Sequence, residues 1–261
     1  FAAAKQLALL RKTTSVAIAS LSMGSVLDVA GTPGAGSLAI GNTTTGVVPT
    51  DATAGFPTIN AFGGSATGYL ASAQFRSTVA GGCILYDRLW HAGSINLNSL
   101  ATTTFSSQPS YTSRLPGGTD YSDLEILLEF NAAVSATATT VAVGYTKEDG
   151  TTGRSTGATG TLASLATRRV LPLPLQAGDK GVQKVDSLTV GGTVATTGSV
   201  NVIVARRLAE FDIRIANQMD AQAWDMLGAP EVFADSALWP VIQPDSTVSG
   251  LVSLGFSILN G

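Results

Sequence analysis

The residues whose types could do chemistry cluster in the stretch GGCILYDRLWHAGS (residues 81–94). It holds the only cysteine, Cys83, and the only histidine, His91, among 261 residues. In contact, a thiol and an imidazole could serve as nucleophile and general base. The alternation of the stretch predicts a strand, on which Cys83 and His91 would share one face but lie roughly 25 Å apart. We therefore interpret Cys83 as a buried thiol and His91 as a residue at a strand end, without a catalytic pair.

Other reactive arrangements lack essential parts. A serine hydrolase would need His91 as its base, and the sequence has no G-x-S-x-G turn for the nucleophile. One histidine and one cysteine are too few for a typical zinc site. The loop GTPGAGS (residues 31–37) lacks the Gly-Lys-Ser/Thr end of a phosphate-binding loop.

Two carboxylate pairs remain. Glu148 and Asp149 lie at an expected hairpin tip, where acidic residues are common. Glu125 and Glu129 fall on one face of an expected strand, which predicts a solvated face rather than a glycosidase pair. Calcium binding by the DATAG or KEDG loops stays open, although neither offers a full ligand array. We expect no catalytic residues, no cofactor and no metal, and hence no enzyme.

The composition points to a partner that covers the surface. Charged residues make up only 13% of the chain, its net charge is −3, and its mean hydropathy is +0.28. There is no clustered basic face for nucleic acid, and no apolar stretch approaches the ~20 residues of a spanning helix. A surface with so few charges is better suited to a large assembly than to a free monomer.

The pattern of elements predicts an all-β fold. Residues 1–12 (FAAAKQLALLRK) are strong helix formers and predict a short helical arm, or a helix that caps the β body. Residues 31–66 are dense in Gly, Pro and Thr and predict long loops. From residue 69, short alternating runs predict about ten strands, with a DG hairpin turn at Asp149-Gly150 and an edge strand at Pro172 and Pro174. We expect a jelly-roll-like β-sandwich over 67–261, preceded by an arm and loop region over 1–66.

Four stretches resemble one family. They are LYDRLWHAG (85–93), PSYTSRLPGGTDYSDLEILLEF (109–130), VAVGYTKEDGTTGRST (141–156) and LPLPLQAGDKGVQKVDSLTV (171–190). Their order is similar to that of a recurring structural protein of tailed-bacteriophage particles, with Y-D-x-L, Y-T-x-x-D-G-T-T-G-R and L-P-L-Q-A-G-D-x-G-V as its signatures. The resemblance runs from about residue 67 to the C-terminus and implies a component of the virion.

Within a particle, the chain best suits a capsid decoration or cement protein. It lacks the long spine helix and extended loop of tailed-phage major capsid proteins. We expect it to oligomerise and to bind the major capsid protein or other virion subunits, with neither nucleic acid nor membrane as a partner. The candidate interface residues are the apolar side chains of the arm and the loops: Phe1, Leu7, Leu10, Phe56 and Phe62.

Three other roles stay open. A tail, neck or fibre component with a receptor- or glycan-binding role would expose aromatic side chains, and of the three tryptophans only Trp224 lies in a polar context. An enzyme acting on cell-wall sugars would need a carboxylate pair in a cleft. A secreted bacterial surface protein is the third alternative, although the chain shows no export signal.

Overall fold

Strands make up most of the regular structure in the computed structural model, which describes residues 5–63 and 67–260. The chain divides into two units. Unit 1 comprises Phe1–Ser37, Pro49–Asp87 and Arg207–Gly261, and unit 2 comprises Leu38–Val48 and Arg88–Arg206. The predicted parts 1–66 and 67–261 have other bounds and stay a prediction. Two long strands, β5 (Gly81–Asn96) and β12 (Ser199–Ile213), contribute residues to both units.

The remaining strands of unit 1 form two sheets together with the unit 1 parts of β5 and β12. They are β1 (Lys5–Lys12), β2 (Gly24–Ser25), β3 (Gly31–Thr32), β4 (Thr67–Ser77), β13 (Met219–Ala223), β14 (Glu231–Phe233), β15 (Leu238–Pro244) and β16 (Val252–Asn260). One sheet has the order β13-β4-β16-β1 and the other β12-β5-β15-β2, with β3 and β14 as short additions to the first sheet. We number the strands of these two orders from 1 to 8 along the chain, leaving out the short β3 and β14. The two sheets then have the orders 6-3-8-1 and 5-4-7-2, which is the arrangement of a jelly roll.

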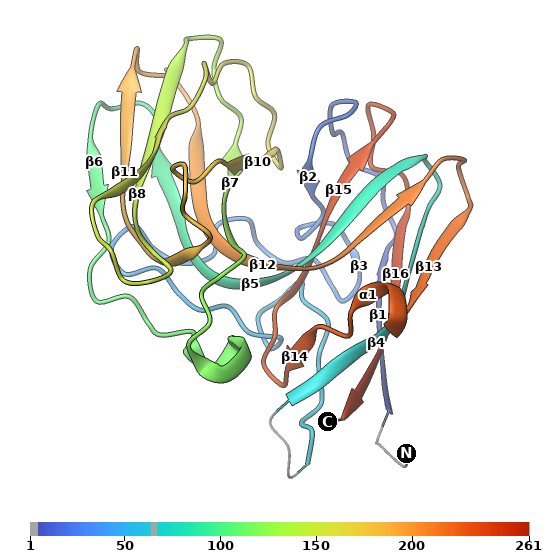
Figure 1. Ribbon diagram of the computed structural model, residues 1–261. Coiled ribbons are helices and arrows are strands. Elements are labelled where there is room, and N and C mark those ends of the chain that lie inside the picture. The colour runs from blue at the N-terminus through green and yellow to red at the C-terminus, as the bar shows by residue number, and fades with distance from the viewer. Residues whose placement is uncertain (1–4, 64–66, 261) are drawn as a thin grey trace. The chain divides into compact units, whose positions relative to one another are not determined.

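Unit 2 repeats this arrangement with its own strands. They are β6 (Thr102–Thr104), β7 (Leu124–Ala132), β8 (Thr139–Lys147), β9 (Arg154–Ala158), β10 (Val170–Leu173) and β11 (Val182–Gly192). The sheets have the orders β10-β7-β12-β5 and β6-β11-β8-β9. When the eight strands from β5 to β12 are numbered 1 to 8, these orders are 6-3-8-1 and 2-7-4-5, the same as in unit 1 with the second sheet read from its other edge. Figure 1 shows β6, β11 and β8 side by side. Unit 2 is therefore a second jelly roll, inserted in the chain between the fourth and fifth strands of the first.

Each unit has its own apolar core between its two sheets. In unit 1, Phe75 of β4 and Phe211 of β12 bring rings from opposite sheets to a centroid distance of 6.1 Å. In unit 2, Leu128 of β7 and Val143 of β8 belong to one buried cluster. The predicted all-β, jelly-roll-like sandwich is confirmed, and the chain contains the motif twice.

The predicted N-terminal helix is wrong for residues 5–12, while residues 1–4 lie outside the described part of the chain. Residues 5–12 form β1, which pairs antiparallel with β16 from Lys5↔Leu259 to Arg11↔Ser253. Helix propensities differ by only a fraction of a kcal/mol per residue, so pairing and burial override them. The burial of Leu10 and Lys12 alternates with the exposure of Leu9 and Arg11, as in a strand with one face on the core.

Several local predictions are confirmed. The DG turn joins β8 to β9, and Gly150 has a φ of 86°, a left-handed conformation that glycine adopts without strain. Pro172 lies in β10, which is an edge strand of its sheet, whereas Pro174 follows the end of that strand at Leu173. Among the described residues of 31–66, the only strand is β3. The one α-helix among the described residues is α1 (Trp224–Leu227), which ends at a left-handed Gly228 with φ 69°.

Candidate functional site

The stretch of residues 81–94 becomes part of β5, and its two rare residues belong to different units. Cys83 lies buried in the core of unit 1. Burial raises the pKa of its thiol far above the ordinary value, because a thiolate is poorly solvated there. Since the thiolate is the nucleophile, Cys83 is inert in the folded protein. The interpretation of Cys83 as a buried thiol is confirmed.

His91 belongs to a buried ionic cluster in unit 2. Its Nδ1 lies 2.9 Å from Nη1 of Arg88, and Arg88 Nη2 donates to Oε1 of Glu129 at 2.8 Å. A guanidinium can only donate, so Nδ1 of His91 is the acceptor and the neutral ring carries its proton on Nε2. Burial, and secondly the Arg88 charge, hold the pKa of His91 well below its usual value. His91 thus lies inside a long strand rather than at its end.

Two further side chains complete the cluster. Asn201 Nδ2 donates to Oε2 of Glu129 at 3.0 Å, and Arg114 Nη2 donates to the carbonyl of Arg88 at 2.8 Å. All of these side chains are fully buried. The solvated face predicted for Glu129 is wrong, because this carboxylate is an internal counter-charge. A substrate has no access to the cluster, and what the geometry provides is a cross-link between β5, β7 and β12.

Metal ligation finds no support in the described residues. Across 5–63 and 67–260, no group of three or more His, Cys, Asp or Glu side chains is placed to hold a metal ion. Likewise, no helix in the described part of the chain is long and apolar enough to cross a membrane.

The predicted interface residues fall in different environments. Leu7 on β1 is 78% exposed. Leu10, Phe56 and Phe62 are buried within unit 1, so an interface role for them stays a prediction that would require them to leave the core. Phe1 lies outside the described residues.

Leu7 belongs to the outer face of the β13-β4-β16-β1 sheet of unit 1, which we name the outer sheet face. The strand register aligns its outward side chains in rows: Leu7, Ser257, Ser72 and Ala223 in one, and Leu9, Gly255, Gln74 and Ala221 in the next. The third row consists of Arg11, Ser253, Arg76 and Met219. Half of these residues are Ser, Ala or Gly, and Leu7, Leu9 and Met219 are the large apolar side chains exposed among them.

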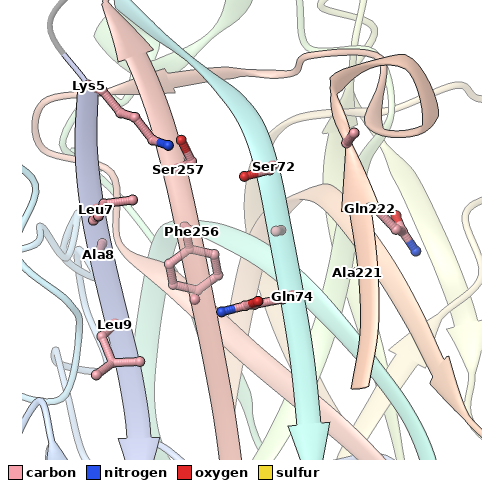
Figure 2. Close-up of a pocket in the computed structure, with 13 residues that line it drawn as sticks. Lys5, Leu7, Ala8, Leu9, Ser72, Gln74, Ala221, Gln222, Phe256 and Ser257 are labelled. Carbon is pink, nitrogen blue, oxygen red and sulfur yellow. The ribbon is translucent and has the colours of Figure 1, made fainter. Parts of the chain in front are cut away.

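An open groove of about 480 Å³ runs over this face. Figure 2 shows Leu7 and Leu9 on β1, with Gln74 on β4 and Ala221 on β13 across β16. Gly255 lies beneath the Gln74 side chain, and a Cβ at that position would contact Gln74 Nε2 at 2.8 Å. Because Gly255 has no side chain, the Gln74 side chain can lie over β16 in the middle of the face.

The three rows contain cations but no carboxylates. Arg11 and Arg76 are exposed, and no Asp or Glu stands in these rows. Lys5, also exposed, lies in a fourth row that continues through Leu259 and Tyr69 to Glu231 on β14. Such a surface offers exposed cations beside apolar side chains. It can bury leucine and methionine side chains against a partner whose carboxylates meet the three cations.

Sequence reasoning found Leu7 but missed Leu9, Met219 and the cations. The signal was present in residues 5–11, where Lys5, Leu7, Leu9 and Arg11 occupy alternate positions. Read with period two, they form one strand face. Met219 could be added only once β13 was known to lie next to β4.

Comparison with known proteins leaves the family of the chain open. No family model and no curated protein matches it, whereas 16 chains of solved structures do. The VP2 subviral particle of infectious bursal disease virus is 11% identical, with 98% of this chain and 79% of that chain covered and a TM-score of 0.20. The T13 viral particle of the same virus is 10% identical, with 99% and 78% covered and a TM-score of 0.20. TM-scores this low carry no argument about function.

Proposed function

We propose that the protein is a structural subunit of a virus particle, and more specifically a capsid decoration or cement protein that binds across neighbouring capsid subunits without catalysis. The observation that carries the proposal is the outer sheet face, an apolar and cationic surface on a sheet whose other side is already packed. The resemblance to tailed-phage structural proteins supports it. Jelly rolls are also frequent in viral capsid proteins, an analogy at the level of the fold.

The binding mechanism follows from the chemistry of the outer sheet face. Each Å² of apolar surface removed from water contributes roughly 25 cal/mol before the costs of association. The backbone that carries these leucines is already paired in a sheet, so a partner that covers them orders side chains and not backbone. Lys5, Arg11 and Arg76 favour a partner rimmed with carboxylates and disfavour cationic surfaces. The expected partners are the major capsid protein or other virion subunits, with a homo-oligomer as the bound form.

The test is co-sedimentation of the purified protein with particles that lack it. Leu7→Asp should weaken binding at least tenfold, since it places a carboxylate in the apolar contact. Leu100→Asp is the matched control, because Leu100 is 62% exposed but belongs to unit 2. Equal binding by wild type and Leu7→Asp would remove the outer sheet face from the proposal.

Electron microscopy of virus particles distinguishes a decoration protein from a tail or vertex component and from the coat subunit itself. Hundreds of copies spread over the shell are expected on intact particles. A few copies at one vertex or on the tail would contradict decoration. Closed shells formed by the purified chain alone would make it the coat subunit itself.

A tail, neck or fibre component with a receptor-binding role is the second candidate. One observation favours it: Trp224 is 67% exposed, as its polar context predicted, whereas Trp90 and Trp239 are buried. Exposed tryptophans are frequent anchors in binding sites. Loss of cell attachment in a Trp224→Ala particle with unchanged shell stability would favour this role over decoration.

A further inference from the structure

A second groove, in unit 2, combines an aromatic ring with hydrogen-bonding side chains. It has a volume of about 600 Å³ and lies between the loop of residues 105–112, Tyr121, and the start of β11 at Gln183 and Lys184. All of its lining residues belong to unit 2, and none of them is part of the buried ionic cluster. We name it the hydroxyl groove.

The hydroxyl groove presents polar groups that the protein itself leaves unused. The side chains of Ser106, Ser107, Tyr121 and Gln183 make no hydrogen bond to any residue that the structure describes. Gln108 adds a buried carbonyl oxygen, Oε1, that also has no hydrogen-bond partner there. A ligand that reached these groups would find both donors and acceptors, and an unpaired buried acceptor is costly without one.

An aromatic platform accompanies these groups. Tyr121 is half-buried and stands edge-to-face on Tyr111, with ring centroids 6.3 Å apart and an interplanar angle of 80°. The Tyr111 side chain is held in place, because its hydroxyl donates to the carbonyl of Gln183 at 2.6 Å. The Tyr121 ring therefore has a supported position against which an apolar ligand face can pack.

The charge of the groove narrows the class of ligand. The described residues that line it include no carboxylate and a single cation, Lys184, which already pairs with Asp186 at 3.0 Å. A phosphate or carboxylate would find no free cation among the described lining residues. A purely apolar ligand would leave the polar groups without partners. A neutral ligand with many hydroxyls and one apolar face satisfies both requirements, and a sugar ring has this chemistry.

The walls of the groove are held in place before any ligand arrives. The amide of Phe105 donates to the carbonyl of Asp186 at 2.9 Å. The amide of Ser106 donates to the carbonyl of Thr44 at 3.0 Å. Gln108 Nε2 donates to the carbonyl of Val185. Ser107 takes a left-handed φ of 52°, unusual for a residue other than glycine and a common feature of binding loops. A fixed loop lowers the entropic cost of binding.

We propose that the hydroxyl groove binds a neutral saccharide, with the ring of Tyr121 against the apolar face of a sugar and the unused side chains bonded to its hydroxyls. The proposal does not rest on the virion role of the protein. The isolated chain can therefore be tested even if it never binds a capsid.

The test begins with an array of neutral and acidic oligosaccharides probed with the full chain. Titrations then follow by ligand-observed NMR, using the neutral oligosaccharide that gives the strongest signal. Tyr121→Ala should weaken binding at least tenfold, as expected for an aromatic contact residue. Tyr69→Ala, which removes a partly exposed tyrosine of unit 1, should leave the affinity unchanged.

A second variant guards against misfolding of Tyr121→Ala. Ser106→Trp fills the groove from an exposed position, so the fold should survive while saccharide binding is lost. Binding by Ser106→Trp with wild-type affinity would overturn the proposal. So would the absence of any neutral saccharide among the bound members of the array. Binding confined to acidic saccharides and lost in Lys184→Ala would instead show simple charge attraction, and would equally overturn it.

Discussion

Replacing Glu129 by glutamine should lower the free energy of unfolding by about 3–5 kcal/mol. The Arg88–Glu129 ion pair has an N–O distance of 2.8 Å, and both side chains are fully buried. Glutamine keeps the size of the side chain but has a single acceptor oxygen, so an NH2 group would face the donor of either Arg88 or Asn201. The change therefore removes the negative charge and one buried hydrogen bond. The guanidinium of Arg88 cannot lose its proton and would stay charged without its counter-charge, a cost of several kcal/mol.

The matched control is Glu210→Gln on β12, because the Glu210 carboxylate pairs with Arg207 in solvent at 3.0 Å. Exposed pairs contribute less than about 1 kcal/mol, so this variant should unfold nearly as the wild type does. Urea unfolding followed by circular dichroism measures both. Hydrogen exchange of β7 peptides assigns the loss to unit 2. A loss below about 1 kcal/mol for Glu129→Gln, equal to the control, would refute the assignment of the cluster as an internal cross-link.

Three further outcomes are expected. Stability should fall as the pH drops below about 6.5, with a slope of up to ~1.4 kcal/mol per unit, because unfolded His91 then binds a proton that the folded ring does not. His91→Gln should remove that slope in urea unfolding across pH 5–7.5. Cys83 should react with a thiol reagent only after denaturation, as counted by mass spectrometry. Gly46→Ala should lower the free energy of urea unfolding by more than about 2 kcal/mol, since Gly46 has a φ of 65° and a Cβ there would strike the Trp90 ring. The control, Gly153→Ala, should lower it less, because Gly153 has a φ of 72° but its Cβ would enter open space.

The sequence predicts the local elements of this fold well, because their signals are local. Alternation places Leu124, Ile126 and Leu128 in the core, and the Asp149-Gly150 pair marks its hairpin. The same reasoning fails at residues 5–12, where helix formers lie in a strand. These residues form a strand because they pair with β16, which is far away in the sequence.

The nesting of one jelly roll within the other has no local signature. It depends on β5 and β12 each serving two units, and a single strand pattern does not reveal how many sheets it serves. The buried cluster was missed for a related reason. Glu129 looks like an exposed charge until Arg88 is known to face it, although its position within the apolar run LEILLEF was a hint.

The pairing of β1 with β16 has a consequence for the order of events on the ribosome. Unit 2 has all of its strands once Arg206 has been made, whereas β1 waits for a partner that begins at Val252. About 240 residues separate Lys12 from Val252, which corresponds to roughly 10–50 s of translation at ~5–20 residues per second. β3 can pair only with Arg11 and Lys12. Throughout this interval the rest of β1, with its alternating leucines, therefore lacks its strand partner and is a template for wrong pairing with other nascent chains. Synthesis of this protein therefore favours early folding of the inserted unit and places the greatest demand for chaperones on the first strand.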